Sequence, residues 1–196
     1  GETSVLCTNT SSLRLRDLAG FLKRPERFLG LHFFNPVPAM KLVEVSPVPA
    51  TDAAVTQLAN DFCVQIEKTP VLIQDLPGYV VNRLLVPYML HAIETLEEGV
   101  ASADAIDTAM KLGCGHPMGP LSLADLIGLD VVLAMAKTMQ TELRDPRYKA
   151  PALLRRLVLA GHLGRKAGRG IYDYTNAQNP VVNPAITADA SAATGT

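Results

Sequence analysis

His32 and Glu44 are the residues of this sequence whose types and placement best suit proton transfer. Each lies in a short apolar run, 28–33 for the histidine and 42–45 for the glutamate, and both runs are predicted to be strands. An imidazole can act as a general base near neutral pH if Nε2 is free and Nδ1 is oriented. A carboxylate on a neighbouring strand can accept the Nδ1 proton and stabilise the imidazolium as it forms. From these two residues alone, the preferred alternative is a core histidine bonded to a backbone carbonyl, with Glu44 on a solvated face.

Two polar segments could complete such a site. Asn9 to Ser12 follow directly on a predicted strand at 5–8, and ligands of open α/β sheets collect at the carboxyl ends of the strands. Asn82 lies on the first turn of a predicted apolar helix, where its amide and the free helical N–H groups can polarise a carbonyl. Both features also have structural interpretations, as a polar turn with a helix cap and as a surface asparagine.

The elements that must position these side chains change in type at residues 75–78. Before this point, strands separated by helices favour an open α/β sheet, and after it five helical segments imply an all-α second domain. The predicted strands are 5–8, 28–33, 42–45 and 69–73. The predicted helices are 13–22, 53–65, 80–98, 103–112, 121–127, 130–143 and 151–159.

Local signals refine the predicted helices and the tail. Thr51 or Asp52 can cap the helix that begins at 53, and Ser102 can cap the one that begins at 103. Pro87 should kink the long helix in which it lies. From Asn176 onward the chain is rich in Ala, Thr, Asn and Pro, so we expect a mobile tail.

Composition narrows the class of protein. The 196 residues are 48% hydrophobic and 19% charged, which is typical of a globular chain. A formal net charge of −1 argues against a nucleic-acid partner. Three widely spaced cysteines give no reason to expect a disulfide framework or a metal site, and favour a reducing compartment. No apolar run approaches the roughly 20 residues of a membrane span, so we expect no membrane association and a cytoplasmic location.

Seven stretches, in order along the chain, resemble the 3-hydroxyacyl-CoA dehydrogenase family. They are 9–13, 27–38, 40–45, 77–84, 115–120, 126–130 and 164–172. Each is weak alone, but the ordered set is highly specific. The resemblance implies an α/β plus all-α fold. It places the C-terminal half of a Rossmann-like NAD-binding domain over 1–76 and a helical dimerisation and substrate domain over 77–175, with a mobile tail over 176–196.

The resemblance also implies roles for individual residues. His32 would be the catalytic base and Glu44 its orienting partner. Ser11 would lie between the nicotinamide end of NAD and the acyl substrate, and Asn82 would hold the reacting oxygen of the substrate.

Two further residues are implied on the cofactor side. Asn35 would lie near the nicotinamide ribose of NAD, and Lys166 would approach the cofactor. The glycines of 161–170 lack the strand, loop and helix context of a phosphate loop, so we interpret them as a flexible turn.

The function implied by the resemblance is NAD-dependent oxidation of (S)-3-hydroxyacyl-CoA to 3-ketoacyl-CoA. The stretch 126–130 points to the 3-hydroxybutyryl-CoA type. We expect an acyl-CoA thioester as substrate and a homodimer formed through the helical domain. Two alternatives stay open: a non-catalytic dimerisation or scaffold fragment, and a related hydroxy-acid dehydrogenase of the lens-crystallin or sugar-acid type.

The sequence departs from the family at its start. It opens at Gly1 without a methionine, and no GxGxxG turn occurs in it. In the family that turn sets the pyrophosphate of NAD on a helix N-terminus. We therefore expect that the opening half of the NAD-binding domain is missing, and that this chain alone binds NAD poorly and has little activity.

Overall fold

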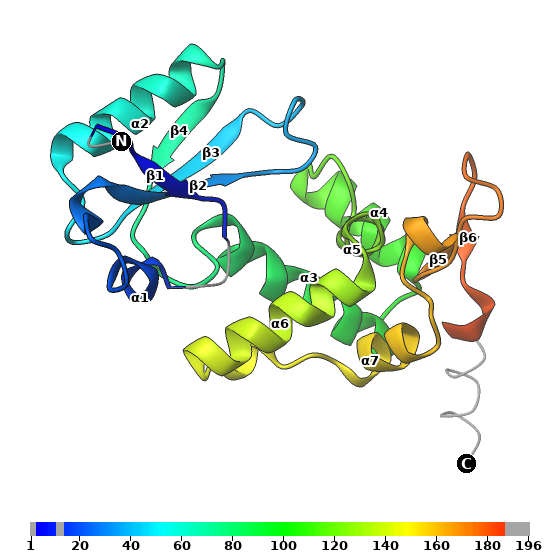
Figure 1. Cartoon of the computed structure of the whole chain (residues 1–196). Coiled ribbons are helices and arrows are strands. Elements are labelled where there is room, and N and C mark those ends of the chain that lie inside the picture. The colour runs from blue at the N-terminus through cyan, green and yellow to red at the C-terminus, as the bar shows by residue number, and fades with distance from the viewer. Residues whose placement is uncertain (1–2, 11–13, 187–196) are drawn as a thin grey trace. The chain divides into compact units, whose positions relative to one another are not determined.

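The computed structural model describes residues 3–10 and 14–186, and it divides the chain into two compact units (Figure 1). The first unit is Gly1–Arg83 and the second is Leu84–Thr196. The first contains a sheet with helices and the second is mainly helical, which is the order that the sequence predicts.

A four-stranded sheet forms the first unit, with its strands side by side in chain order (Figure 1). The strands are β1 (Leu6–Thr8), β2 (Phe28–Phe33), β3 (Leu42–Pro47) and β4 (Thr69–Leu72). All four lie where the sequence predicts strands. Strands β1 and β2 are parallel, as are β3 and β4, whereas β2 and β3 are antiparallel. The short 34–41 connection explains this last pairing, because a parallel pair needs a crossover of a dozen or more residues.

Three short elements connect the strands. They are α1 (Leu15–Ala19), the 3-10 turn η1 (Pro25–Arg27) and α2 (Ala53–Gln65). Helix α2 has its predicted bounds, but the predicted side-chain cap is wrong, because Asp52 makes no capping hydrogen bond. The Thr51 hydroxyl instead donates to the Phe28 carbonyl at 2.6 Å and accepts from the Val48 N–H at 2.9 Å. It therefore ties the loop before α2 to β2.

The two faces of the sheet differ because successive side chains of a strand point to opposite sides. One face packs on α2 and forms an apolar core of Leu29, Leu31, Val43, Val45, Val55, Ala59 and Cys63. The other face carries Gly30 and His32 from β2, opposite Ser46 and Glu44 from β3. His32 and Glu44 therefore share the face of the sheet that is turned away from α2.

Five helices make up most of the second unit, as predicted, within the part of the chain that the structure describes. They are α3 (Val81–Glu97), whose first turn belongs to the first unit, α4 (Ala103–Cys114), α5 (Pro120–Ile127), α6 (Leu129–Leu143) and α7 (Ala152–Leu159). Two 3-10 turns, η2 (Pro146–Tyr148) and η3 (Arg165–Ala167), follow α6 and α7. The Ser102 hydroxyl accepts from the Ala105 N–H at 3.4 Å, which confirms the predicted cap of α4.

The segment beyond residue 176 differs from the prediction as far as Ile186. Strand β6 (Val181–Val182) pairs with β5 (Tyr172–Asp173), and Asn183 and Ile186 are buried. Asn183 donates its amide to the Gly170 carbonyl at 2.7 Å. These contacts hold the segment on the second unit, and residues 187–196 of the predicted tail lie outside the described residues. Over the described ranges, no helix has the length and apolarity that a membrane crossing requires.

Candidate active site

His32 and Glu44 meet directly, as the sequence predicts. They are register partners on β2 and β3, and His32 Nδ1 lies 2.7 Å from Glu44 Oε2. Residues directly opposite each other on one face of an antiparallel pair are close enough for their side chains to interact. Glu44 is only 1% exposed and His32 8%, so the alternative that places the glutamate on a solvated face is wrong.

The second carboxylate oxygen of Glu44 binds the start of α3. Glu44 Oε1 accepts from the N–H groups of Val80 and Val81, each at 3.0 Å. The first N–H groups of a helix have no partner within it, and the helix dipole favours a negative charge there. Glu44 therefore links the histidine on β2 to the helix that carries Asn82.

These contacts decide the charge of Glu44. Burial raises the pKa of its carboxyl, but the hydrogen bonds from His32, Val81 and Val80, together with the charge of His32, hold the pKa below its ordinary value. The carboxylate is therefore ionised near neutral pH and can only accept hydrogen bonds. Its contact with Nδ1 then requires a proton on Nδ1, which leaves Nε2 of a neutral His32 free to accept one.

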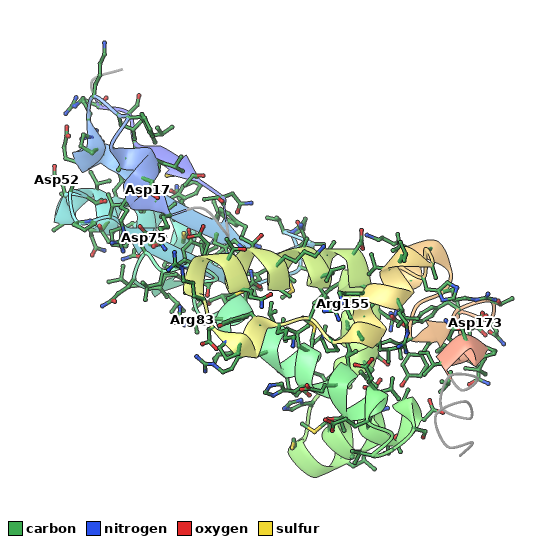
Figure 2. All side chains as sticks on the ribbon, turned by 90° about the horizontal axis from the view of Figure 1, so that it is seen from below. Asp17, Asp52, Asp75, Arg83, Arg155 and Asp173 are labelled. Carbon is green, nitrogen blue, oxygen red and sulfur yellow. The ribbon has the colours of Figure 1, made fainter. Side chains whose placement is uncertain are left out.

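Asp75 anchors the segment that leads into α3. Its side chain, labelled in Figure 2, is 8% exposed. The two carboxylate oxygens accept from the N–H groups of Leu15 at 3.0 Å and Arg16 at 2.9 Å. After it the chain turns through Gly78, with φ of 78°, and Tyr79, with φ of 47°. Left-handed backbone is disfavoured for a tyrosine. The strain is confined to the residue just before the two N–H groups that bind Glu44.

Two aromatic rings confine the imidazole. The ring centroid of His32 lies 4.6 Å from that of Phe34 and 5.4 Å from that of Tyr79. The interplanar angles are 62° and 55°, close to the edge-to-face arrangements that aromatic rings prefer. The pair of His32 and Glu44 is thus held by two paired strands, the start of α3 and two aromatic rings.

Asn82 is the predicted site residue that follows this anchor. It is the second residue of α3 and is half-buried. In the part of the chain that the structure describes, no group hydrogen-bonds its side-chain amide. The amide is therefore available to an oxygen of a bound ligand. Ser11, the other predicted substrate residue, lies outside the described residues.

Two asparagines lie just beyond the carboxyl ends of β1 and β2. Asn9 accepts from the Phe33 N–H through Oδ1 at 2.8 Å, so its amide NH₂ remains able to donate. Asn35 is exposed two residues after β2. Both residues lie at strand ends, where ligands of open α/β sheets collect, and the place of Asn35 near the nicotinamide ribose stays a prediction.

Lys166 is placed in the second unit, in η3, where Asp130 binds it. Its Nζ lies 2.6 Å from Asp130 Oδ1 and 2.8 Å from Oδ2. The structure thus gives this lysine a partner near the start of α6, and its approach to the cofactor stays a prediction. Within the described ranges, no three His, Cys, Asp or Glu side chains are grouped so that they could hold a metal ion.

A hollow of about 680 Å³ in the first unit is separate from the histidine site. It is lined by residues of β1, β2 and α2, including Leu31, Phe33 and Phe62. Leu31 and Phe33 flank His32 in β2 and therefore point to the opposite face of the sheet. This hollow thus lies on the face of the sheet opposite to the one that carries His32 and Glu44.

Sequence reasoning missed Asp75 and Tyr79. Asp75 acts on residues about sixty positions earlier, and no short-range pattern reports such a contact. Tyr79 could have drawn attention because it follows Pro77 and Gly78, a pair typical of a turn. Both residues shape the helix start that holds Glu44.

A sheet of nucleotide-binding type followed by a helical unit, with a buried histidine–carboxylate pair, is the arrangement of a two-domain dehydrogenase. The family model described as the NAD binding domain of 3-hydroxyacyl-CoA dehydrogenase matches residues 1–76, and the model of its C-terminal domain matches 78–174. The chain belongs to the 3-hydroxyacyl-CoA dehydrogenase family.

Similar proteins agree with this assignment. A 3-hydroxybutyryl-CoA dehydrogenase of Clostridioides difficile is 49% identical over 173 residues, which cover 88% of this chain and 62% of the relative. A mitochondrial hydroxyacyl-coenzyme A dehydrogenase of Mus musculus is 45% identical over 88% of this chain and 55% of the relative. The crystal structure of (S)-3-hydroxybutyryl-CoA dehydrogenase from Ralstonia eutropha has a TM-score of 0.86 at 46% identity, over 90% of this chain and 62% of that one. The chain thus spans about 60% of the length of such relatives.

Proposed function

We propose that this chain carries the proton-transfer site of an NAD-dependent (S)-3-hydroxyacyl-CoA dehydrogenase that acts on 3-hydroxybutyryl-CoA. The observation that carries the proposal is the 2.7 Å contact between His32 and Glu44, with Glu44 bound in turn to the N–H groups that open α3. The names of the relatives support the substrate. A scaffold would have no need of an ionised carboxylate buried against a histidine.

In the proposed reaction, His32 Nε2 accepts the proton of the 3-hydroxyl group while the C3–O bond becomes a carbonyl. A bound NAD would supply the acceptor for the hydride at C3, and Asn35 would hold its nicotinamide end. Glu44 stabilises the positive charge that develops on His32, and the Asn82 amide donates to the substrate oxygen. In the reverse direction, protonated His32 returns its proton to the 3-keto oxygen. Much of the rate enhancement comes from holding these groups in position.

The remaining roles belong to the same proposal. Ser11 and Asn82 contact the substrate, and Ser11, Asn35 and Lys166 face the cofactor. The substrate is an acyl-CoA thioester, and two copies of the chain associate through the helical unit. The enzyme works in the cytoplasm.

A chimeric enzyme provides the test. The 173 matching residues of the Clostridioides difficile relative are replaced by those of this chain, and reduction of acetoacetyl-CoA by NADH is followed. We expect turnover, and a loss on the order of 10²–10⁴-fold in His32→Ala, because a positioned general base contributes about that much. His91→Ala is the matched control, since His91 lies exposed on α3 in the second unit. A folded chimera without activity, or one that is indifferent to His32→Ala, contradicts the proposal.

A further inference from the structure

Two hydroxyl groups are buried beside the histidine pair without a hydrogen-bond partner. Tyr79 is 4% exposed and Ser46 is fully buried, and neither Tyr79 Oη nor Ser46 Oγ has a partner among the described residues. Burial of a hydroxyl group without a hydrogen bond is unfavourable, so native proteins nearly always provide a protein group or an internal water molecule. Two such hydroxyl groups in one small unit indicate a site that binds an internal water molecule or another polar group.

The two hydroxyls belong to the same place on the sheet. Gly30 and Ser46 are register partners on β2 and β3. A Cβ atom added to Gly30 would lie 2.7 Å from Leu15 Cδ1, 3.2 Å from Tyr79 Oη and 3.4 Å from Ser46 Cβ. The missing side chain of Gly30 therefore leaves space that a methyl group of Leu15 and the hydroxyl of Tyr79 occupy, and Ser46 borders that space.

This place adjoins the proton-transfer residues. Gly30 precedes His32 by two residues and Ser46 follows Glu44 by two, so all four lie on one face of the sheet. The ring of Tyr79 lies 5.4 Å from that of His32, while its hydroxyl reaches the space at Gly30. The backbone of Tyr79 also sets the turn from which the N–H groups of Val80 and Val81 reach Glu44.

We propose that Tyr79 is a positioning residue for His32 and Glu44, and that its hydroxyl and that of Ser46 form a binding site for one internal water molecule. The water donates to one hydroxyl oxygen and accepts from the other, which gives it the two polar partners that a buried water needs. Held at its far end in this way, the ring of Tyr79 stays against the imidazole and fixes its plane toward Glu44. The importance of Tyr79 for catalysis rests on the proposed function, whereas its role in positioning the His32 ring does not.

The test measures how fast the Nδ1 proton of His32 exchanges with solvent, by NMR of the purified chain. His32→Gln identifies the signal by removing it. The variants are Tyr79→Phe, Ser46→Ala and the double variant; each is smaller than the native residue and keeps the fold. We expect each single variant to speed exchange about fivefold, the equivalent of losing one ordinary hydrogen bond. The double variant should be no faster than either single one, because both hydroxyls hold the same water.

Tyr174→Phe is the matched control, since it removes a tyrosine hydroxyl from the second unit and should leave the exchange rate of the His32 proton unchanged. An unchanged rate in Tyr79→Phe overturns the positioning role. If exchange in the double variant is faster by the product of the two single effects, the two hydroxyls do not share one water molecule, and the shared water site is overturned. The exchange measurement needs no turnover. An inactive chimera would therefore contradict the proposed function without affecting the test of Tyr79 and Ser46.

Discussion

The two units each bury a carboxylate, and the two carboxylates differ in what they bind. Glu44 of the first unit gives one oxygen to two backbone N–H groups and the other to a histidine ring. Asp125 of the second unit is fully buried. It accepts from the N–H groups of Ile171 and Tyr172, each at 2.9 Å, and from the Tyr174 hydroxyl at 3.0 Å.

Asp107 repeats the pattern of Asp125 in the second unit. It accepts from the N–H groups of Leu121 and Ser122 at 2.8 and 2.9 Å, and from the Tyr172 hydroxyl at 2.9 Å. None of these donors changes its charge near neutral pH. A buried carboxylate alone therefore does not indicate an active site, and the feature that distinguishes Glu44 is a partner able to take up and release a proton.

The largest expected effect comes from Glu44→Gln. The amide oxygen of glutamine can still accept from Val80 and Val81, but its NH₂ group then faces Nδ1 of His32 and favours a proton on Nε2. We expect turnover of the chimera to fall on the order of 10²–10⁴-fold with little change in KM, because the base is held in the wrong tautomer. Glu94→Gln replaces an exposed glutamate of α3 and serves as control. Equal turnover in the Glu44→Gln variant and its control would mean that the contact of Glu44 with His32 has no catalytic role. Glu44 would then be a structural carboxylate, like Asp125.

A glycine beside Asp125 provides the next test. A Cβ atom on Gly170 would lie 2.1 Å from Asp125 Oδ1, whereas one on Gly113 would meet nothing within 4 Å. We expect Gly170→Ala to destabilise the second unit by about 3 kcal/mol and Gly113→Ala to have almost no effect. Amide hydrogen exchange, resolved by residue, measures each unit separately. Similar hydrogen-exchange protection in both variants would mean that the residues around Asp125 shift to make room for the added methyl group.

Asp125→Asn should have a somewhat smaller effect. Three donors surround the carboxylate, and an amide offers one acceptor oxygen in place of two. We expect a loss of about 2 kcal/mol in the second unit, the cost of leaving a buried donor unsatisfied. Asp104→Asn, at an exposed position of α4, is the control. A neutral Asp125→Asn would mean that the three donors find other acceptors.

The smallest effects are the opposite pH dependences of the stability that Glu44 and Asp125 contribute. Burial raises the pKa of Asp125 to about 6, outweighing the hydrogen bonds from Tyr172, Ile171 and Tyr174. The folded state then binds this proton more tightly than the unfolded state, so this contribution to stability is lost as pH rises from about 4 to 6. The lowered pKa of Glu44 acts in the other direction, and its contribution is lost as pH falls below its ordinary value of 4.5.

Each slope is limited to about 1.4 kcal/mol per pH unit for one proton. Amide hydrogen exchange between pH 3 and 7 measures how the stability of each unit depends on pH. The contribution of Glu44 to this dependence should disappear in Glu44→Gln, and that of Asp125 in Asp125→Asn. A slope between pH 4 and 6 that Asp125→Asn leaves unchanged, or a slope below pH 4.5 that Glu44→Gln leaves unchanged, would contradict the assigned charges.

The strands and the meeting of His32 with Glu44 could be predicted because they follow from local patterns. Short apolar runs mark β2 and β3, and the family motifs put both residues in them. The anchor of this pair could not be predicted in the same way. It depends on Asp75 reaching Leu15 and on the left-handed turn at Tyr79, and both are set by contacts between distant parts of the chain.

The end of the second unit shows the same limit. Composition predicts little packing beyond Asn176, since the segment has few apolar residues. Its order as far as Ile186 comes from two strand residues, Val181 and Val182, and from one buried asparagine, Asn183. A polar residue that bonds backbone carbonyls leaves no periodic signal in the sequence.

The central claim is that Glu44 holds His32 as a base with a free Nε2, and the tautomer of the ring tests it most directly. The measurement is a long-range ¹H–¹⁵N NMR spectrum of the purified chain, at a pH above the ordinary range of histidine titration. We expect the neutral ring of His32 to carry its proton on Nδ1, with an unprotonated Nε2. A ring protonated on Nε2 would contradict the account.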